Sequence, residues 1–404
     1  MARDSLYPVS VKAGKPILGM LPTGWQKLSL EKCLNIEARK AYIQDNQEYD
    51  LVTVKRSRGG VIRREHLKGK DISVKSQFYI KEGDFLISKR QIVHGACGLV
   101  PKELSGSIVS NEYCVLTGKS GFYLPYMEFL SESLYFQQTC FHSSIGVHIE
   151  KMIFKLDSWF KWPFNIPPLS EQKRIVKILS TWDKAISVTE KLLANSQRQK
   201  KALMQQLLTG NKRLLDENGV RFNGKWEKKL LSDVADVYQP KTISQSMMSD
   251  SGYPVYGANG VIGFYQEFNH ETEQIAVTCR GSTCGIVNWT QAKSWITGNA
   301  MVINTDNYSY VSKKFLFYTL NGSDLKYLIS GSGQPQITGN IKTHIINLPC
   351  IEEQQKIATV LSAADAEIYT LEKKLACLRD EKKALMQQLL TGKRRVKVDE
   401  AVAE

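Results

Sequence analysis

The sequence lacks long apolar runs and paired cysteines. No apolar stretch approaches the roughly 20 residues that a membrane-spanning helix needs, and residues 1–10 carry charges and a proline where a signal peptide needs an apolar segment. The eight cysteines are scattered, with no CxxC pair and no histidine spacing typical of a zinc site. We therefore expect a soluble cytoplasmic protein with reduced cysteines, no metal and no membrane contact.

Motifs for catalysis and cofactor binding are also missing. The sequence has no Walker loop for ATP, and its six histidines show no triad or ligand spacing. Residues 165–169, NIPPL, resemble the Asn/Asp-Pro-Pro-aromatic loop of amino-methyltransferases only superficially, because the prolines come one place late and no aromatic residue follows. The sequence predicts a binding protein that is not an enzyme and has no cofactor of its own.

Acidic residues are too few to balance the basic ones. The chain has 54 Lys and Arg against 40 Asp and Glu, a net charge of +14, which favours a polyanionic partner such as nucleic acid. Most of the excess lies before residue 223, whereas residues 223–346 hold 10 basic and 9 acidic residues. If both halves bind the same kind of partner, they cannot both do so by charge alone.

The chain contains an internal repeat. The segment KKALMQQLLTG occurs at 200–210 and again at 382–392, and the same offset aligns residues 165–186 with 347–368. Each copy begins at a proline stop, has acidic residues where the first helical turn belongs and ends at a glycine. These signals predict one long helix in each copy.

Each predicted helix has a narrow apolar seam. Apolar residues recur at alternating four- and three-residue steps for about five heptads, which is typical of a helix that pairs with another helix. At 1.5 Å per residue, a helix over 170–208 is roughly 58 Å long. The alternative is two separate amphipathic helices, each lying on its own domain. The predicted packing residues are Ile175, Leu179, Trp182, Ile186, Leu193, Leu203, Leu207, Ile357, Leu361, Ile368, Leu371, Leu375, Leu378, Leu385 and Leu389.

Ahead of each helix lies a region of mixed α/β composition. We expect a domain at 1–164, a helix and linker at 165–222, a second domain at 223–346, and a second helix with a tail at 347–404. Two like units can pair their helices antiparallel around a pseudo-twofold axis, an arrangement that matches the local twofold symmetry of duplex DNA. Short β-branched runs predict strands at 49–54, 78–80, 85–87, 274–278, 285–289 and 300–303.

The doubled helix pattern carries a family resemblance. A helix beginning PPLSEQKRI and ending KKALMQQLLTG, with the starts LPTGWQKL and NGKWEKKL before the two domains, resembles the specificity subunit of type I restriction-modification enzymes. The stretches YPVYGANGVIGFY, CRGSTCGIVNW and GSGQPQITGNIKTHIINLP of the second domain add to the resemblance. It covers almost the whole chain.

The resemblance implies a DNA-recognition protein without catalysis of its own. It implies that each variable domain is a target-recognition domain that reads one part of a bipartite sequence in double-stranded DNA, and that the two helices form a coiled-coil spacer. It also implies two partner modification subunits that bind S-adenosylmethionine and methylate adenine, and restriction subunits that translocate and cleave DNA. The rival interpretations are a self-sufficient DNA methyltransferase and a coiled-coil scaffold for protein interactions.

The candidate DNA contacts differ between the two domains. In the first domain, basic residues broken by glycines suit a loop that follows a groove, and another basic group follows a predicted strand; the alternative is a solvated charged face. In the near-neutral second domain, amides, hydroxyls and an aromatic ring are the expected readers, although residues 331–340 also suit a plain turn. The candidates are Lys55, Arg56, Arg58, Arg63, Arg64, Lys89, Arg90, Gln91, Tyr256, Asn259, Arg280, Ser282, Thr283, Gln334 and Gln336.

Overall fold

The computed structural model describes residues 14–257, 260–331 and 335–397. The chain divides into two compact units: the first contains the described residues up to 188 and from 375 onward, and the second contains residues 189–374. The two long helices, α5 (Leu169–Leu207) and α8 (Ile351–Leu390), each contribute to both units. None of the helices within the described ranges is long and apolar enough to cross a membrane.

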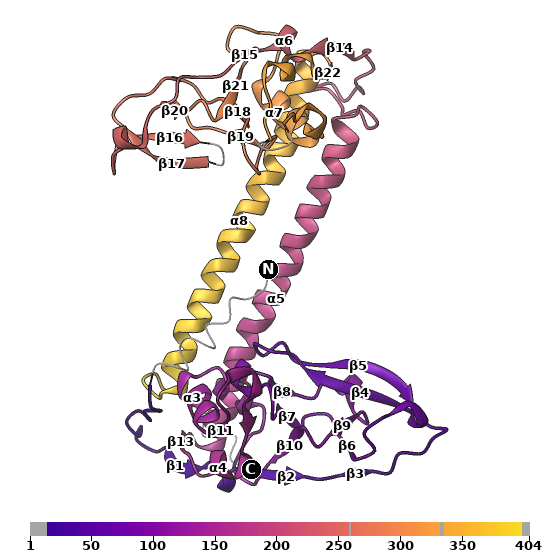
Figure 1. Cartoon of the computed structure of the whole chain (residues 1–404), viewed down its shortest axis with the longest axis vertical. Coiled ribbons are helices and arrows are strands. Elements are labelled where there is room, and N and C mark those ends of the chain that lie inside the picture. Colours follow the sequence, from indigo (N-terminus) through magenta and orange to yellow (C-terminus); the bar gives the residue numbers. More distant parts are fainter. Residues whose placement is uncertain (1–13, 258–259, 332–334, 398–404) are drawn as a thin grey trace. The chain divides into compact units, whose positions relative to one another are not determined.

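The first unit is built on two main sheets (Figure 1). A four-stranded antiparallel sheet has the order β2 (Leu34–Glu37), β10 (Tyr113–Gly118), β7 (Phe85–Ser88) and β8 (Cys97–Leu99). A five-stranded sheet has the order β3 (Lys40–Ala41), β6 (Gln77–Tyr79), β9 (Ile108–Ser110), β4 (Glu48–Val54) and β5 (Val61–Lys68). The remaining elements are the pairs β1 (Gln26–Ser29) with β13 (Pro163–Ile166) and β11 (Ser144–Ile145) with β12 (Ile153–Phe154), and the helices α2 (Tyr126–Leu130), α3 (Leu134–His142) and α4 (Leu156–Phe160).

The second unit has its own four-stranded antiparallel sheet (Figure 1). The order is β15 (Asp236–Tyr238), β21 (Ala300–Asn304), β18 (Ile275–Thr278) and β19 (Val287–Trp289). A three-stranded sheet has the order β17 (Gly260–Tyr265), β16 (Tyr253–Gly257) and β20 (Trp295–Ile296). The other strands are the pair β14 (Glu227–Leu230) with β22 (Ile345–Leu348), and the short α-helices are α6 (Leu231–Val234) and α7 (Lys313–Gly322).

The two four-stranded sheets are equivalent strand by strand. In the first, Leu116 of β10 pairs with Ile36 on one side and Phe85 on the other. In the second, Ile303 of β21 pairs with Val237 and Ile275 in the same way. The internal repeat seen in the helices therefore extends into the globular parts, where the sequences have diverged.

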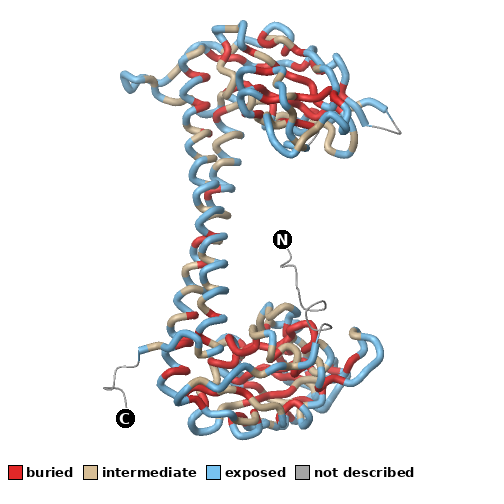
Figure 2. The backbone as a smooth tube through the Cα atoms, turned by 90° about the vertical axis from the view of Figure 1, so that its left-hand side faces the viewer, coloured by how far each residue is buried: buried red, intermediate tan, exposed pale blue. Residues whose placement is uncertain are grey.

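Within each unit the two long helices lie antiparallel. In the first unit, Asp183 of α5 forms an ion pair with Lys382 of α8 at 2.6 Å; in the second, Ser196 of α5 donates a hydrogen bond to Glu367 of α8 at 3.0 Å, and Lys200 pairs with Asp365. The predicted packing residues are all buried or half-buried, while most of their neighbours along the helices are exposed. Figure 2 shows buried backbone gathered in the sheets of each unit, with separated buried turns along the helices.

The helices also enter the core of each unit. Ile175 and Leu179 of α5 and Leu389 of α8 belong to the largest apolar cluster of the first unit, together with Trp25 and Trp159. The full burial of Trp159 shows that the aromatic residues before α5 pack its start against the domain. In the second unit, Leu207, Ile357 and Leu361 belong to the main apolar cluster in the same manner.

In each unit, a buried glutamate in the first turn of a long helix binds a tryptophan and an arginine. In the first unit, Glu171 accepts hydrogen bonds from Trp25 Nε1 at 3.0 Å and from Arg395 Nε and Nη2 at 2.9 and 2.8 Å. The first-turn acidic residues were expected to favour the positive end of the helix dipole. The structure adds a specific partner: an arginine from the segment that follows the opposite helix.

The second unit repeats this arrangement. Glu353 accepts from Trp226 Nε1 at 3.2 Å and from Arg213 Nε and Nη2 at 2.5 and 2.6 Å. Gly210 lies against the ring of Trp226 with φ of 73°, where a Cβ would come within 3.5 Å of the ring. The glycine that ends each repeat thus allows the left-handed turn, with φ of 73° at Gly210 and 68° at Gly392.

Candidate nucleic-acid interface

The structure brings the two basic groups of the first domain together. Residues 55–60 form the turn between β4 and β5. The backbone N–H of Ser57 donates to the carbonyl of His94 at 2.7 Å, and that of Arg58 donates to Gly95 at 2.9 Å. The short 3-10 helix η3 (Ile92–His94) that holds this turn directly follows Lys89, Arg90 and half-buried Gln91. The basic candidates therefore share one region.

Carboxylates neutralise most arginines of this region. Arg63 and Arg64 lie on the strand β5 rather than on the loop, so among the basic candidates only Lys55, Arg56 and Arg58 occupy the turn itself. The pairs are exposed or half-buried, and such pairs contribute about 0–1 kcal/mol each, so a phosphate or a base could replace the carboxylate at small cost. The pairs are Arg56–Glu150 at 2.7 Å, Arg58–Glu132 at 3.8 Å, Arg63–Asp50 at 2.9 Å, Arg64–Glu65 at 3.3 Å and Arg90–Glu112 at 2.5 Å.

Two histidines beside these pairs have pKa values that their surroundings shift in opposite directions. His66 on β5 lies 2.6 Å from Asp50 and 3.2 Å from Glu48, and hydrogen bonds to these carboxylates raise its pKa. Burial, together with the charge of Arg56, lowers the pKa of His94 in η3. His66 therefore holds a proton more readily than a free histidine, whereas His94 gives up its proton more readily.

Arg280 is the only arginine between residues 223 and 346. It follows the buried strand β18 and is exposed, and its side chain has no hydrogen bond or ion pair to any other residue within the described ranges. It lines a cavity of about 320 Å³ whose wall also includes Tyr238, Gln239, Gln336 and Lys342. A guanidinium fork beside amide groups suits the recognition of a base edge or a phosphate.

The predicted candidates of the second domain converge on this cavity only in part. Arg280 and Gln336 form an isolated β-bridge and line the same cavity, while Ser282 and Thr283 lie on the loop between β18 and β19. Gln239 and Lys342 were not predicted; they come from segments far apart in the sequence, which spacing alone does not bring together. Asn259 and Gln334 lie outside the described residues.

The predicted base contact by Tyr256 is wrong. Its side chain is only 7% exposed and belongs to an apolar cluster with Ala276, Ile296 and Val302. Its hydroxyl accepts a hydrogen bond from the backbone N–H of Gln291 at 3.1 Å. Tyr256 therefore fixes the loop before β20, because β16 pairs with both β17 and β20 and directs this ring inward.

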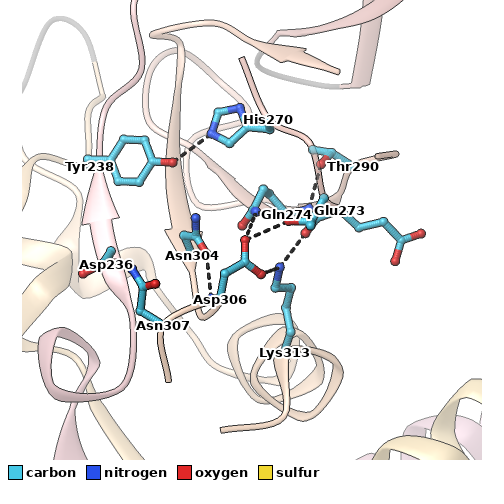
Figure 3. Close-up of polar contacts among 11 residues, drawn as sticks. Asp236, Tyr238, His270, Glu273, Gln274, Thr290, Asn304, Asp306, Asn307 and Lys313 are labelled. Atoms are coloured by element: carbon cyan, nitrogen blue, oxygen red, sulfur yellow. Dashed lines mark hydrogen bonds and ion pairs between the residues drawn. The ribbon is translucent and has the colours of Figure 1, made fainter. Parts of the chain in front are cut away.

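A polar network supports the wall of the cavity. The Tyr238 hydroxyl lies 2.9 Å from His270 Nε2, and the two rings are nearly parallel, with an interplanar angle of 13°. Figure 3 shows this contact as a dashed line. Asp306 accepts hydrogen bonds from Lys313 at 2.5 Å and from Gln274 at 3.0 Å. Burial opposes ionisation of Asp306, but these bonds outweigh it and lower its pKa. The Asp306 contacts tie the end of β21 to α7, and the Tyr238 contact ties β15 to His270, so we interpret both as structural.

Chain comparisons identify the fold and then the family. Solved structures of the HsdS subunit from Thermoanaerobacter tengcongensis (19% identity, TM-score 0.51) and of the type I restriction-modification S subunit from M. genitalium (14% identity, TM-score 0.61) each cover 93% of this chain, and 99% of each of those chains is covered. They share the fold of two mixed α/β domains with long helices.

The family is shown by sequence. The type I restriction modification DNA specificity domain matches residues 22–195 and again residues 223–377, so the chain belongs to this family. It is 28% identical over 307 residues to the type I restriction enzyme MjaVIII specificity subunit of Methanocaldococcus jannaschii, covering 68% of this chain and 70% of that protein. The resemblance drawn from the doubled helix pattern is confirmed.

Proposed function

We propose that this chain is the DNA sequence-specificity subunit of a type I restriction-modification complex and binds an asymmetric, bipartite target in double-stranded DNA. The observation that carries the proposal is the repetition of one sheet in which an arginine after matching strands has different surroundings in the two domains. Arg90 and its ion pair follow β7, whereas Arg280 and its cavity follow the equivalent strand β18. Two domains of one fold with different surfaces would read two different sequences.

The long helices would act as a coiled-coil spacer between the two parts of the target. Their apolar seams are covered within each unit, and a continuous helix of 39 residues has a length of roughly 58 Å. A pseudo-twofold axis between the repeated units would suit the local symmetry of duplex DNA. The spacer would then set the number of base pairs between the two parts.

The chemistry would belong to partner subunits. Two modification subunits carrying S-adenosylmethionine would methylate adenine, and restriction subunits would translocate and cleave DNA in the cytoplasm. This chain would contribute recognition, with no catalytic residue and no cofactor. Within the described residues there is also no group of three or more His, Cys, Asp or Glu placed to hold a metal ion.

The test is reconstitution with purified components. The chain is incubated with labelled S-adenosylmethionine and DNA, first alone and then with a modification subunit. We expect methyl transfer only in the second case, at sites with two separated parts. Methylation by the chain alone would support a self-sufficient methyltransferase instead.

DNA binding separates the proposal from a protein-interaction scaffold. A DNA-binding complex that contacts phosphates loses affinity steeply with salt, by about 0.9 in log–log slope for each phosphate contacted. A scaffold whose basic face is incidental would show weak binding without preference for any sequence.

A further inference from the structure

An arginine stands at the same structural position in both domains. The backbone N–H of Lys89 donates to the carbonyl of Glu112 at 2.9 Å, and the N–H of Cys279 donates to the carbonyl of Asn299 at 3.0 Å. These two bonds extend the equivalent pairings of β7 with β10 and of β18 with β21. The next residue is Arg90 in the first domain and Arg280 in the second.

The residue opposite the one that precedes this arginine differs between the domains. Glu112 accepts from Arg90 Nε at 2.5 Å and from Arg90 Nη2 at 3.3 Å, so it neutralises and orients the guanidinium. Its counterpart Asn299 is exposed and uncharged, and no carboxylate of the described chain pairs with Arg280. One position therefore presents an oriented, neutral pair, and the other presents a single positive charge beside a cavity.

These two arrangements suit different chemistry on DNA. A guanidinium donates two hydrogen bonds to O6 and N7 of guanine, and a carboxylate accepts from the N4 amino group of cytosine. Both side chains of the Arg90–Glu112 pair are about half exposed, at 58% and 45%, so the two groups can separate or turn toward DNA at small cost. Asn299 offers an amide and leaves Arg280 charged.

We propose that Glu112 and Asn299 are specificity-determining residues because each sets what the neighbouring arginine recognises. In the first domain, Arg90 binds guanine while Glu112 accepts from the cytosine amino group, so the pair reads G·C. In the second domain, Arg280 binds guanine without a carboxylate partner. This inference rests on the proposed function. It adds that the arginine after each of the two strands binds the edge of a guanine in the major groove.

The test exchanges the two residues in the full chain, assembled with its modification subunit. Glu112→Asn and Asn299→Glu are assayed by sequencing the methylated products of a randomised duplex library. In Glu112→Asn we expect the first part of the target to lose cytosine discrimination at one position by about 10-fold, because one hydrogen bond from the cytosine amino group to a charged acceptor is lost. In Asn299→Glu the second part should keep its guanine and discriminate G·C at that position more strongly, to a similar extent, because the new carboxylate can accept from the cytosine amino group. The other part should stay unchanged in each variant.

Two controls separate base reading from other effects. Glu31→Asn makes the same charge change on an exposed turn of the first domain and should leave the target unchanged. Glu112→Asp retains the carboxylate and should preserve cytosine preference; thermal melting of each variant reports folding. An unchanged target in both exchanges overturns the inference, as does an equal change of affinity on all duplexes, which indicates a phosphate contact. If the wild-type complex itself methylates no bipartite site, the proposed function fails instead.

Discussion

The Arg395→Ala variant tests how much the ion pair between Arg395 and Glu171 stabilises the first unit. Arg395 binds Glu171 through Nε and Nη2, and Glu171 has only 3% of its side chain exposed. In Arg395→Ala the buried carboxylate keeps the hydrogen bond from Trp25 but loses its charged partner. Breaking a buried ion pair on one side destabilises proteins by about 3–5 kcal/mol. Because 43% of the Arg395 side chain is exposed, water replaces part of the interaction, and we expect a loss of about 2 kcal/mol.

The second unit provides a matched comparison. Arg213 is 20% exposed and its partner Glu353 is 0% exposed, so Arg213→Ala should be the more damaging variant, at about 3 kcal/mol. Hydrogen exchange by mass spectrometry on the full chain measures both losses at the first hydrogen-bonded amides of α5 and α8, from Gln172 and Gln354 onward. A loss of 2 kcal/mol corresponds to about 30-fold faster exchange at these amides of α5.

A double-mutant cycle isolates the charge interaction. In the Glu171→Gln background no carboxylate is left uncompensated, so Arg395→Ala should accelerate exchange by less than about 5-fold. Equal effects in the two backgrounds would refute the assignment of an ion pair. Arg213→Ala should accelerate exchange at the start of α8. Faster exchange at the start of α5 instead would show that each arginine does not stabilise its own unit separately.

Three further predictions concern the fold, its pH response and the spacer. Tyr256→Phe should leave DNA affinity unchanged and lower stability by about 1 kcal/mol, the contribution of one hydrogen bond; reduced sequence discrimination would restore Tyr256 as a reader. Burial lowers the pKa of His270 below its ordinary value of about 6.5. The stability contributed by this histidine is therefore present above pH 6.5 and lost as pH falls through the folded pKa. The free energy of unfolding measured with urea should vary less between pH 7.5 and 5 in His270→Gln than in wild type, and an equal variation would contradict this. Deleting one heptad from each helix should narrow the gap in the methylated target by about three base pairs, because seven residues span about 10 Å; an unchanged gap would exclude the spacer.

Elements defined by local pattern were predictable from the sequence. The runs at 85–87 and 300–303 form β7 and β21, because continuous apolar residues bounded by polar turns favour buried strands. The α5 helix begins and ends within one residue of the predicted 170–208, since its proline start and glycine end are local signals. The seam positions were likewise recognisable, because the heptad spacing depends only on neighbouring turns.

Features that depend on distant pairing were not predictable. Glu150 neutralises Arg56 across 94 residues, so the basic stretch looked more positive than the folded surface is. Tyr256 looked accessible because β16 was not recognised as a central strand. The exact match of Arg90 to Arg280 depends on the register of two sheets, which is set by pairing between distant strands.

The central claim is that each domain reads its own part of the DNA target. Its most direct test replaces residues 223–346 with those of a related specificity subunit, followed by sequencing of the methylated sites made by the reconstituted complex. The account predicts that one part of the target changes to that of the donor protein, while the other part and the gap are retained. A target that changes in both parts, or in neither, would contradict it.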